Sequence, residues 1–202
     1  MHWSVLLVGG ASGVGKSSLA RPLAHRLGVN LVEVDDFQLV LEATFPPPQL
    51  PLLHFWRTNR EEFDAWDDDQ RIAHFVEVCD DVFRPGVEAV IGERLEVGLP
   101  VIVEGDFLLP AWAQAPTFAG RPNDGRVRAL FVTEDDEEQL LANYFLREDE
   151  LQPQRAHASW AVDRWLRDEC ARVGVPTIEA RPWETTVERA RALLDDDRSS
   201  CS

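Results

Sequence analysis

Short runs of consecutive apolar residues recur along this chain, separated by segments with helical periodicity. A continuous apolar run bounded by glycine or polar residues indicates a strand that is buried on both faces, as in a parallel sheet. The pattern predicts such strands at residues 4–8, 31–34, 101–103, 127–132 and 177–178. We therefore expect a parallel sheet of about five strands.

Between these strands, apolar residues return at intervals of three and four, which indicates amphipathic helices. Asn59 with Glu62, and Thr133 with Asp136, have the capping-box pattern that opens a helix. The spacing predicts helices over residues 17–27, 59–79, 86–97, 133–147, 156–173 and 183–194.

Strands that alternate with helices predict an α/β fold of three layers, with helices on both faces of a parallel sheet. In such a fold, ligands bind at the carboxyl ends of the strands. Two stretches predict irregular structure instead: residues 44–58, which contain four prolines, and residues 111–125. The length of 202 residues fits one domain over residues 1–196, followed by a frayed tail at 197–202.

The net charge of −16 narrows the classes of partner. A surface this negative repels phosphate backbones, so we expect neither a nucleic-acid nor a membrane partner. The three cysteines lack the spacing of a metal site or a disulfide framework, and the first apolar run is too short for a signal peptide. We therefore expect a cytoplasmic protein, and the sequence leaves open whether it is a monomer or a homodimer.

A glycine-rich motif stands between the first predicted strand and the first predicted helix. Residues 10–17, GASGVGKS, match G-x-x-x-x-G-K-[ST], in which glycines bring backbone N–H groups close to phosphate oxygens. The following helix directs its positive dipole end at the same anion. Lys16 would contact the β- and γ-phosphates, and Ser17 would bind magnesium. The residues expected to hold a nucleotide are Gly10, Ser12, Gly13, Val14, Gly15, Lys16, Ser17 and Ser18.

Lys16 is the only lysine in the chain, which otherwise uses 19 arginines. A compact ammonium on a flexible stem fits between phosphates where a planar guanidinium does not, so this exception supports a working phosphate loop. The single lysine also excludes a GTPase switch, whose N-K-x-D motif requires a second one. No transporter signature such as L-S-G-G-Q is present in the sequence.

The segment GGASGVGKSSLARPLAHRLG resembles the opening of the P-loop small-molecule kinases, which share the nucleoside monophosphate kinase fold. It is most similar to 2-phosphoglycerate kinase and chloramphenicol phosphotransferase-like proteins. The resemblance is strong over residues 4–37 and 99–110, and absent over 38–60. It implies a P-loop NTPase fold with a small lid, and an ATP- and Mg²⁺-dependent kinase acting on a hydroxyl of a small-molecule metabolite or antibiotic. A nucleotide-binding ATPase or regulatory module without phosphotransfer remains the alternative.

An acidic pair follows the second predicted strand. Asp35-Asp36-Phe37 resembles the D-D-F or D-S-F signature of uridine-kinase-like enzymes. The match implies that Asp35 is the catalytic base and that Asp36 is a second acid near substrate or metal. The alternative is that one of the two aspartates caps the next helix.

A second acidic motif ends the third predicted strand, in VIVEGDFLLP at residues 101–110. An apolar strand that ends in an acid is the layout in which a carboxylate holds magnesium, so Glu104 is a metal-binding candidate. The stretch also resembles V-E-G-x-H-L-x-P of 2-phosphoglycerate kinases, with Asp106 in place of the histidine. Asp106 is therefore either a substrate-binding residue or an ordinary loop residue.

Cations that arrive on lid closure would neutralise charge in the transition state of a kinase. Arg147 and Arg155 flank a polar segment that resembles a lid, about residues 147–156, and both are catalytic candidates. The alternative for each is a solvated surface arginine. After the last predicted strand, where related kinases enclose adenine, Arg181 or Trp183 is expected to stack on the base.

The acceptor-binding insertion is expected at about residues 38–60, the segment outside the resemblance. His54 and Arg57 are its substrate-binding candidates, next to aromatic residues that otherwise pack beneath a loop. Residues 38–75 are strongly acidic, which favours a cationic or neutral polyol acceptor over an anionic one.

Overall fold

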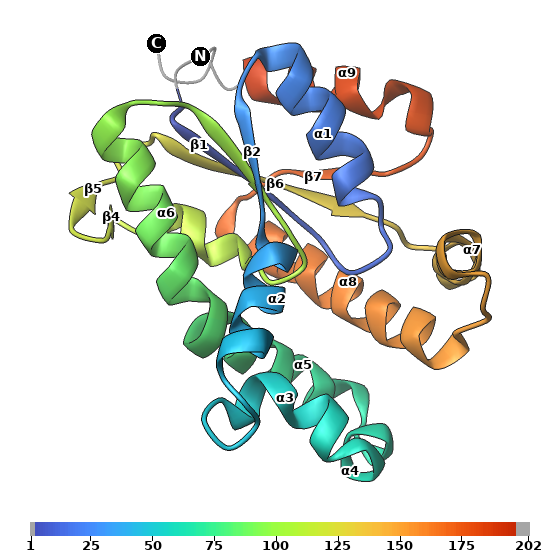
Figure 1. Ribbon diagram of the computed structural model, residues 1–202. Helices are drawn as coiled ribbons and strands as arrows, with labels where there is room; N and C mark the ends of the chain where they lie inside the picture. The colour runs from blue at the N-terminus through green and yellow to red at the C-terminus, as the bar shows by residue number, and fades with distance from the viewer. Residues whose placement is uncertain (1–2, 197–202) are drawn as a thin grey trace.

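The computed structural model describes residues 3–196, in which five strands form one parallel sheet (Figure 1). Each neighbouring pair of strands is parallel, so their carboxyl ends lie at the same edge. The five strands predicted from continuous apolar runs are confirmed. In spatial order they are β2 (Asn30–Glu33), β3 (Val101–Glu104), β1 (Val5–Gly9), β6 (Val127–Thr133) and β7 (Thr177–Glu179).

Helices cover both faces of this sheet, which confirms the predicted three layers. Successive side chains of a strand point to opposite faces, so one strand feeds two cores. Leu6 and Val8 of β1 pack with α1 and α9, whereas Val5 and Leu7 pack with α6 and α8. The helices concerned are α1 (Lys16–Leu27), α6 (Arg84–Val97), α8 (Pro153–Val173) and α9 (Thr186–Asp196).

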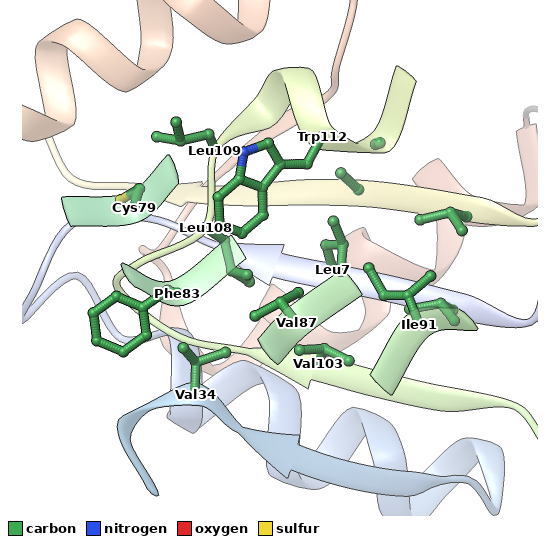
Figure 2. Close-up of a cluster of buried hydrophobic side chains, with 14 of the residues drawn as sticks. Leu7, Val34, Cys79, Phe83, Val87, Ile91, Val103, Leu108, Leu109 and Trp112 are labelled. Atoms are coloured by element: carbon green, nitrogen blue, oxygen red, sulfur yellow. The ribbon is translucent and has the colours of Figure 1, made fainter. Parts of the chain in front are cut away.

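The core on the α6 face also fixes the segment that follows β3. Figure 2 shows Leu7 of β1 and Val103 of β3 facing Ile91 of α6, with Leu108 and Phe83 beside them. These side chains are almost completely buried. The chain after β3 is therefore held against the sheet immediately beyond the strand end.

Residues 34–83 form a helical extension at one side of the sheet (lower part of Figure 1). The prediction of an irregular loop over residues 44–58 holds for residues 45–50 and is wrong from Pro51 on, because this last of its prolines begins a helix. Proline is tolerated in a first helical turn because the N–H that it lacks would have no helical partner there. The extension comprises α2 (Val34–Thr44), α3 (Pro51–Thr58), α4 (Arg60–Ala65), α5 (Asp68–Glu77) and the π-helix η1 (Val78–Phe83).

The prediction of one helix over residues 59–79 is also wrong. Asn59 makes no side-chain cap, and the chain leaves the helical conformation at Trp66. The capping box lies further along, where Asp67 accepts a hydrogen bond from the backbone N–H of Gln70 and the Gln70 side chain accepts one in return. A stronger cap inside the predicted span therefore divides it in two.

Two smaller differences concern the second half of the chain. Asp136, rather than Thr133, caps α7 (Glu137–Glu148), because its carboxylate accepts from the N–H groups of Glu138 and Gln139. The predicted loop at 111–125 contains some regular structure: a 3₁₀ turn (Pro110–Gln114) and the antiparallel strands β4 (Thr117–Phe118) and β5 (Arg121–Pro122).

The predicted frayed tail, residues 197–202, lies outside the described residues. Between residues 3 and 196, no helix has the length and apolar content needed to cross a membrane.

Candidate active site

The motifs that the sequence singled out meet at the carboxyl edge of the sheet. The phosphate loop follows β1, the Asp35-Asp36 pair follows β2 and the segment with Asp106 follows β3. These three strands are neighbours, and Glu104 of β3 stands level with Val8 of β1 and with Glu33 of β2. The parallel register therefore brings the three segments to one place.

The phosphate loop has the backbone of an anion-binding loop. Gly10, Gly13 and Gly15 have φ values of 143°, 83° and 100°, which L side chains rarely adopt. Gly15 occupies the N-cap position of α1, so the positive end of the helix dipole opens into the loop. Asn143 of α7 donates to the carbonyl oxygen of Gly13 at 2.9 Å, and the ring of Tyr144 packs against the same glycine. Helix α7 thus supports the loop from outside the motif.

Lys16 is almost fully buried, with 6% of its side chain exposed. Its ammonium donates to the carbonyl oxygen of Ala11 at 2.8 Å and forms an ion pair with Asp106. Burial acts to lower the pKa of Lys16, but the carboxylates of Asp106, Glu104 and Asp35 outweigh it and leave that pKa raised. The ammonium is therefore firmly charged where a phosphate would bind.

Ser17 and Glu104 form the pair that fits a magnesium ion. The Ser17 hydroxyl donates to Oε1 of Glu104 at 2.8 Å, and Glu104 is 3% exposed. Its second oxygen, Oε2, is buried without a hydrogen-bond partner. Burial raises the pKa of Glu104, although Ser17 and Lys16 act against that shift. A buried carboxylate oxygen without a partner beside a hydroxyl suits a hard cation that prefers oxygen ligands.

Within residues 3–196, no group of three or more His, Cys, Asp or Glu side chains is arranged so that it could hold a metal ion by itself. Magnesium at this place would therefore take most of its ligands from water and from the phosphates of a nucleotide, as is usual for this ion.

Gly105 allows the segments after β2 and β3 to approach each other. A Cβ atom at Gly105 would lie 2.6 Å from the Cβ of Val34, closer than side chains tolerate. This contact sets Asp106 and Asp35 close enough to interact. Partial desolvation raises the pKa of Asp35, the charge of Asp106 raises it further, and Lys16 and Arg147 act in the opposite direction.

The first turn of α2 holds both aspartates of the acidic pair. Glu33 occupies the N-cap position, and no side-chain cap hydrogen bond is formed there, so neither Asp35 nor Asp36 caps the helix. The side chains of Asp35 and Asp36 are both exposed. The pair is thus free for a role other than helix capping.

The two arginines of the predicted lid share one acid. Arg147 and Arg155 both pair with Glu148, at 2.7 and 2.9 Å, and both guanidinium groups lie over the ring of Tyr144. Hydrogen bonds from Gln152 and Arg147 lower the pKa of Glu148 to about 2. Of the two arginines, Arg147 is the one whose charge reaches Asp35.

The two adenine candidates have different surroundings. Arg181 makes two hydrogen bonds of 2.7 Å to Glu134, a carboxylate that is 3% exposed. Trp183 instead lies on the phosphate loop: a Cβ at Gly15 would be 2.4 Å from its Cζ3 atom. The structure therefore brings Trp183 to the nucleotide loop and engages Arg181 in an ion pair.

His54 and Arg57 of α3 have partners within the predicted insertion. His54 is buried, and its Nε2 lies 2.7 Å from the carbonyl oxygen of Phe45. Arg57 pairs with Glu42 at 2.9 Å and lies over the ring of Trp56. Their expected contact with a substrate stays a prediction.

Sequence reasoning missed the residues that support the site from a distance, namely Asn143, Tyr144 and Glu134. None of them belongs to a motif. Leu140 and Tyr144, four residues apart, are the buried face of α7, and this spacing is the one signal that directs α7 towards the loop.

No family model matches the chain. Among curated proteins, it is 26% identical over 202 residues to the 2-phosphoglycerate kinase of Methanothermobacter thermautotrophicus, an alignment covering 91% of this chain and 63% of that protein. The 2-phosphoglycerate kinase of Pyrococcus furiosus is 34% identical over 116 residues, which cover 54% of this chain and 36% of that protein. The predicted similarity to 2-phosphoglycerate kinases is confirmed, and the chain spans less than two thirds of the length of these relatives.

Among solved structures, shikimate kinase from Acinetobacter baumannii in complex with shikimate has a TM-score of 0.51 at 15% identity, over 98% of this chain and 95% of that one. A sugar kinase from Janibacter sp. HTCC2649 has a TM-score of 0.50 at 19% identity, over 96% and 95% of the two chains. At this level of identity the likeness concerns the fold. The predicted P-loop NTPase fold is confirmed.

Proposed function

We propose that this protein is a magnesium- and ATP-dependent kinase that transfers the γ-phosphoryl group of ATP to a hydroxyl of a small-molecule acceptor. The observation that carries the proposal is the meeting of Lys16, the Ser17–Glu104 pair and Asp35 at one edge of the sheet. Each of these groups supplies one component that phosphoryl transfer requires: a phosphate-binding cation, a magnesium site and a base.

Phosphate binding is the task of the loop and of Lys16. The positive end of α1 and the N–H groups of the loop attract the phosphates. Lys16 would exchange its contacts with Asp106 and Ala11 for oxygens of the β- and γ-phosphates. Asp106 is the main cause of the raised pKa of Lys16, and the phosphate oxygens would take over that role as negative neighbours of the ammonium. We infer that Trp183, which already covers Gly15, lies beside the base of the nucleotide.

Ser17 and Glu104 would hold the metal through the serine hydroxyl and the free Oε2 atom, directly or through water. Bound magnesium supplies neutralisation of the negative charge that builds up on the phosphate oxygens. The almost complete burial of Glu104 makes its interaction with a cation stronger than a surface carboxylate could provide.

Asp35 would accept the proton of the attacking hydroxyl. Its raised pKa makes it a better base than an ordinary aspartate. Arg147, whose charge reaches Asp35, is the arginine we expect to approach the transferring group when the segment after α7 closes. Arg155 shares Glu148 with it and would move together with it.

A reducing compartment suits this proposal. Cys79 and Cys170 are buried free thiols, and burial raises the pKa of Cys170 to about 12. Such thiols are structural rather than reactive. They support the expected cytoplasmic location.

Replacement of Lys16 by alanine tests the proposal most directly. We expect Lys16→Ala to lose at least about a hundredfold in ATP turnover, because a buried cation that contacts the phosphates is removed. Arg26→Ala is the matched control, since it removes a cation from the exposed end of the same helix. Nucleotide affinity should be measured by calorimetry and turnover by ADP release with a panel of hydroxylated acceptors.

The outcomes separate the proposal from its alternative. Unchanged nucleotide affinity in Lys16→Ala would remove the phosphate-loop interpretation. Hydrolysis of ATP by the wild type that no acceptor accelerates would favour the ATPase or regulatory module.

A further inference from the structure

Asp106, in the segment after β3, places a negative charge next to the phosphate loop. It forms an ion pair with Lys16, and its side chain is 26% exposed, so it is open to a bound molecule. It also acts on Asp35 from the adjoining segment, because Gly105 packs directly against Val34. Under the proposed kinase function, an acceptor hydroxyl that approaches Asp35 would therefore also come near the carboxylate of Asp106.

Nucleotide binding would weaken the ion pair of Asp106. When Lys16 contacts phosphate oxygens, its positive charge is shared between them and Asp106, and the carboxylate faces a second negative group. A buried or half-buried charge that loses its partner is unfavourable unless a new donor replaces the old one. An acceptor bound beside Asp106 would supply that donor.

The helices of residues 34–83 offer little positive charge to an anionic acceptor, and the arginine whose charge acts on Asp35, Arg147, belongs to α7. Residues 34–83 contain twelve acidic residues and three arginines. Arg57 pairs with Glu42, and Arg60 pairs with Asp64. Arg71 donates through Nη2 to the backbone carbonyl of Asp64 and lies over a phenylalanine ring, while its Nε is buried without a partner. A phosphate or carboxylate group brought to this side would meet like charge.

We propose that the acceptor is a hydroxylated molecule without a negative charge, of the polyol or amino-sugar class, and that Asp106 selects it by accepting a hydrogen bond from a second hydroxyl or an ammonium group. The inference rests on the proposed kinase function. It predicts that this chain does not prefer 2-phosphoglycerate, the anion after which its curated relatives are named.

The test compares acceptors of different charge with the same purified protein, ATP and magnesium. Sorbitol and glycerol represent neutral polyols, kanamycin represents amino sugars, and 2-phosphoglycerate and D-glycerate represent anions. We expect phosphorylation of a non-anionic member, with kcat/KM for the anions roughly tenfold to a hundredfold lower, as expected for like charges a few ångströms apart. Product analysis should show the phosphate on the acceptor.

Asp106→Asn should shift this selectivity. Removal of the charge is expected to raise the ratio of anionic to non-anionic kcat/KM roughly tenfold. Asp124→Asn is the matched control: it removes one charge from an exposed turn before β6, and asparagine tolerates the positive φ of that position. The control should leave the ratio unchanged, and thermal unfolding should confirm that both variants fold.

Three results would overturn the inference. A wild-type preference for an anionic acceptor would do so while leaving the kinase proposal intact, since transfer would still occur. An unchanged ratio in Asp106→Asn would likewise remove only the role of Asp106. Nucleotide binding without phosphorylation of any acceptor in the panel would count against the inference and against the proposed transfer together.

Discussion

The phosphate-loop side and the α2–α5 side of the candidate site are held in place differently. On the first side, β1 and β3 are buried along their whole length, and Lys16 and Glu104 are anchored within a few residues of those strands. On the second side, α4 and α5 contain no fully buried residue. The first side lies in the core, whereas α4 and α5 lie at its margin and the second side enters the core mainly through Val34 of α2, Leu53 of α3 and the π-helix η1.

A separate aromatic cluster holds the second side together. It consists of Phe55, Phe63, Trp66 and His74, and the rings of Phe55 and Trp66 stack at 4.8 Å. A small cluster of half-buried rings stabilises less than a continuous core does, so this region should open locally more easily. Under the proposed function, the nucleotide would therefore bind at the better-buried side, and an acceptor bound at the other side would meet a part of the chain that opens more easily.

The largest expected effect concerns the residue at which the two sides meet. Asp35→Asn should reduce kcat by roughly a hundredfold to ten-thousandfold, because proton acceptance is lost, and should leave ATP affinity nearly unchanged. Because the pKa of Asp35 is raised, the increase of wild-type kcat with pH should occur at a higher pH than it would for an ordinary aspartate. Asp36→Asn, measured in the same assay, identifies the base: a larger loss there would transfer the role to Asp36.

Asp163 of α8 allows a test of the buried core, because its titration should make the stability of the protein depend on pH. It is fully buried, accepts from the N–H of Glu134 at the end of β6, and has a pKa raised by burial to about 6. The native state therefore binds this proton more tightly than the unfolded state, so the stability it contributes at low pH is lost as pH rises from about 4 to about 7.

In Asp163→Asn, the loss of stability between about pH 4 and pH 7 that Asp163 causes should be absent. The free energy of unfolding of the wild type minus that of the variant should fall by up to about 3 kcal/mol over this interval. Urea unfolding at several pH values measures it. A difference that stays flat, or that grows with pH, would contradict the assignment.

Gly105→Ala should disturb the contact between the segments after β2 and β3. The new methyl group would press on Val34, and we expect a loss of about 1 to 3 kcal/mol in stability together with reduced turnover. Gly86→Ala is the control, because its new methyl group meets only Phe37 at an ordinary 3.8 Å. Equal stability of the two variants in thermal unfolding would argue against the close contact.

The smallest effect is expected within the aromatic cluster. Trp66→Leu removes the stacked partner of Phe55 and should weaken the region by about 1 kcal/mol. Hydrogen exchange should become faster in α3–α5 and remain unchanged in the sheet, with a higher KM for the acceptor and no change for ATP. Faster exchange in β1 or β3 would show that the two sides are not independent.

The two sides also differ in how well the local sequence predicts their secondary structure. The strands and the phosphate loop were predictable because a buried strand needs a continuous apolar run and an anion loop needs glycines at set positions. The helices of residues 44–79 were not, since Pro51 occurs at a helix start and Asp67 supplies a cap that competes with the pattern at Asn59. Local signals there are weak and contradict one another.

Residue order alone was enough for the sheet, the phosphate loop and the acids that follow β2 and β3, because each is encoded within a few consecutive residues. The folded chain was needed to show that Asp106 pairs with Lys16, that Trp183 covers Gly15 and that Arg181 is engaged with Glu134. These contacts join residues far apart in the chain, and only strand order and packing bring their side chains within reach of one another.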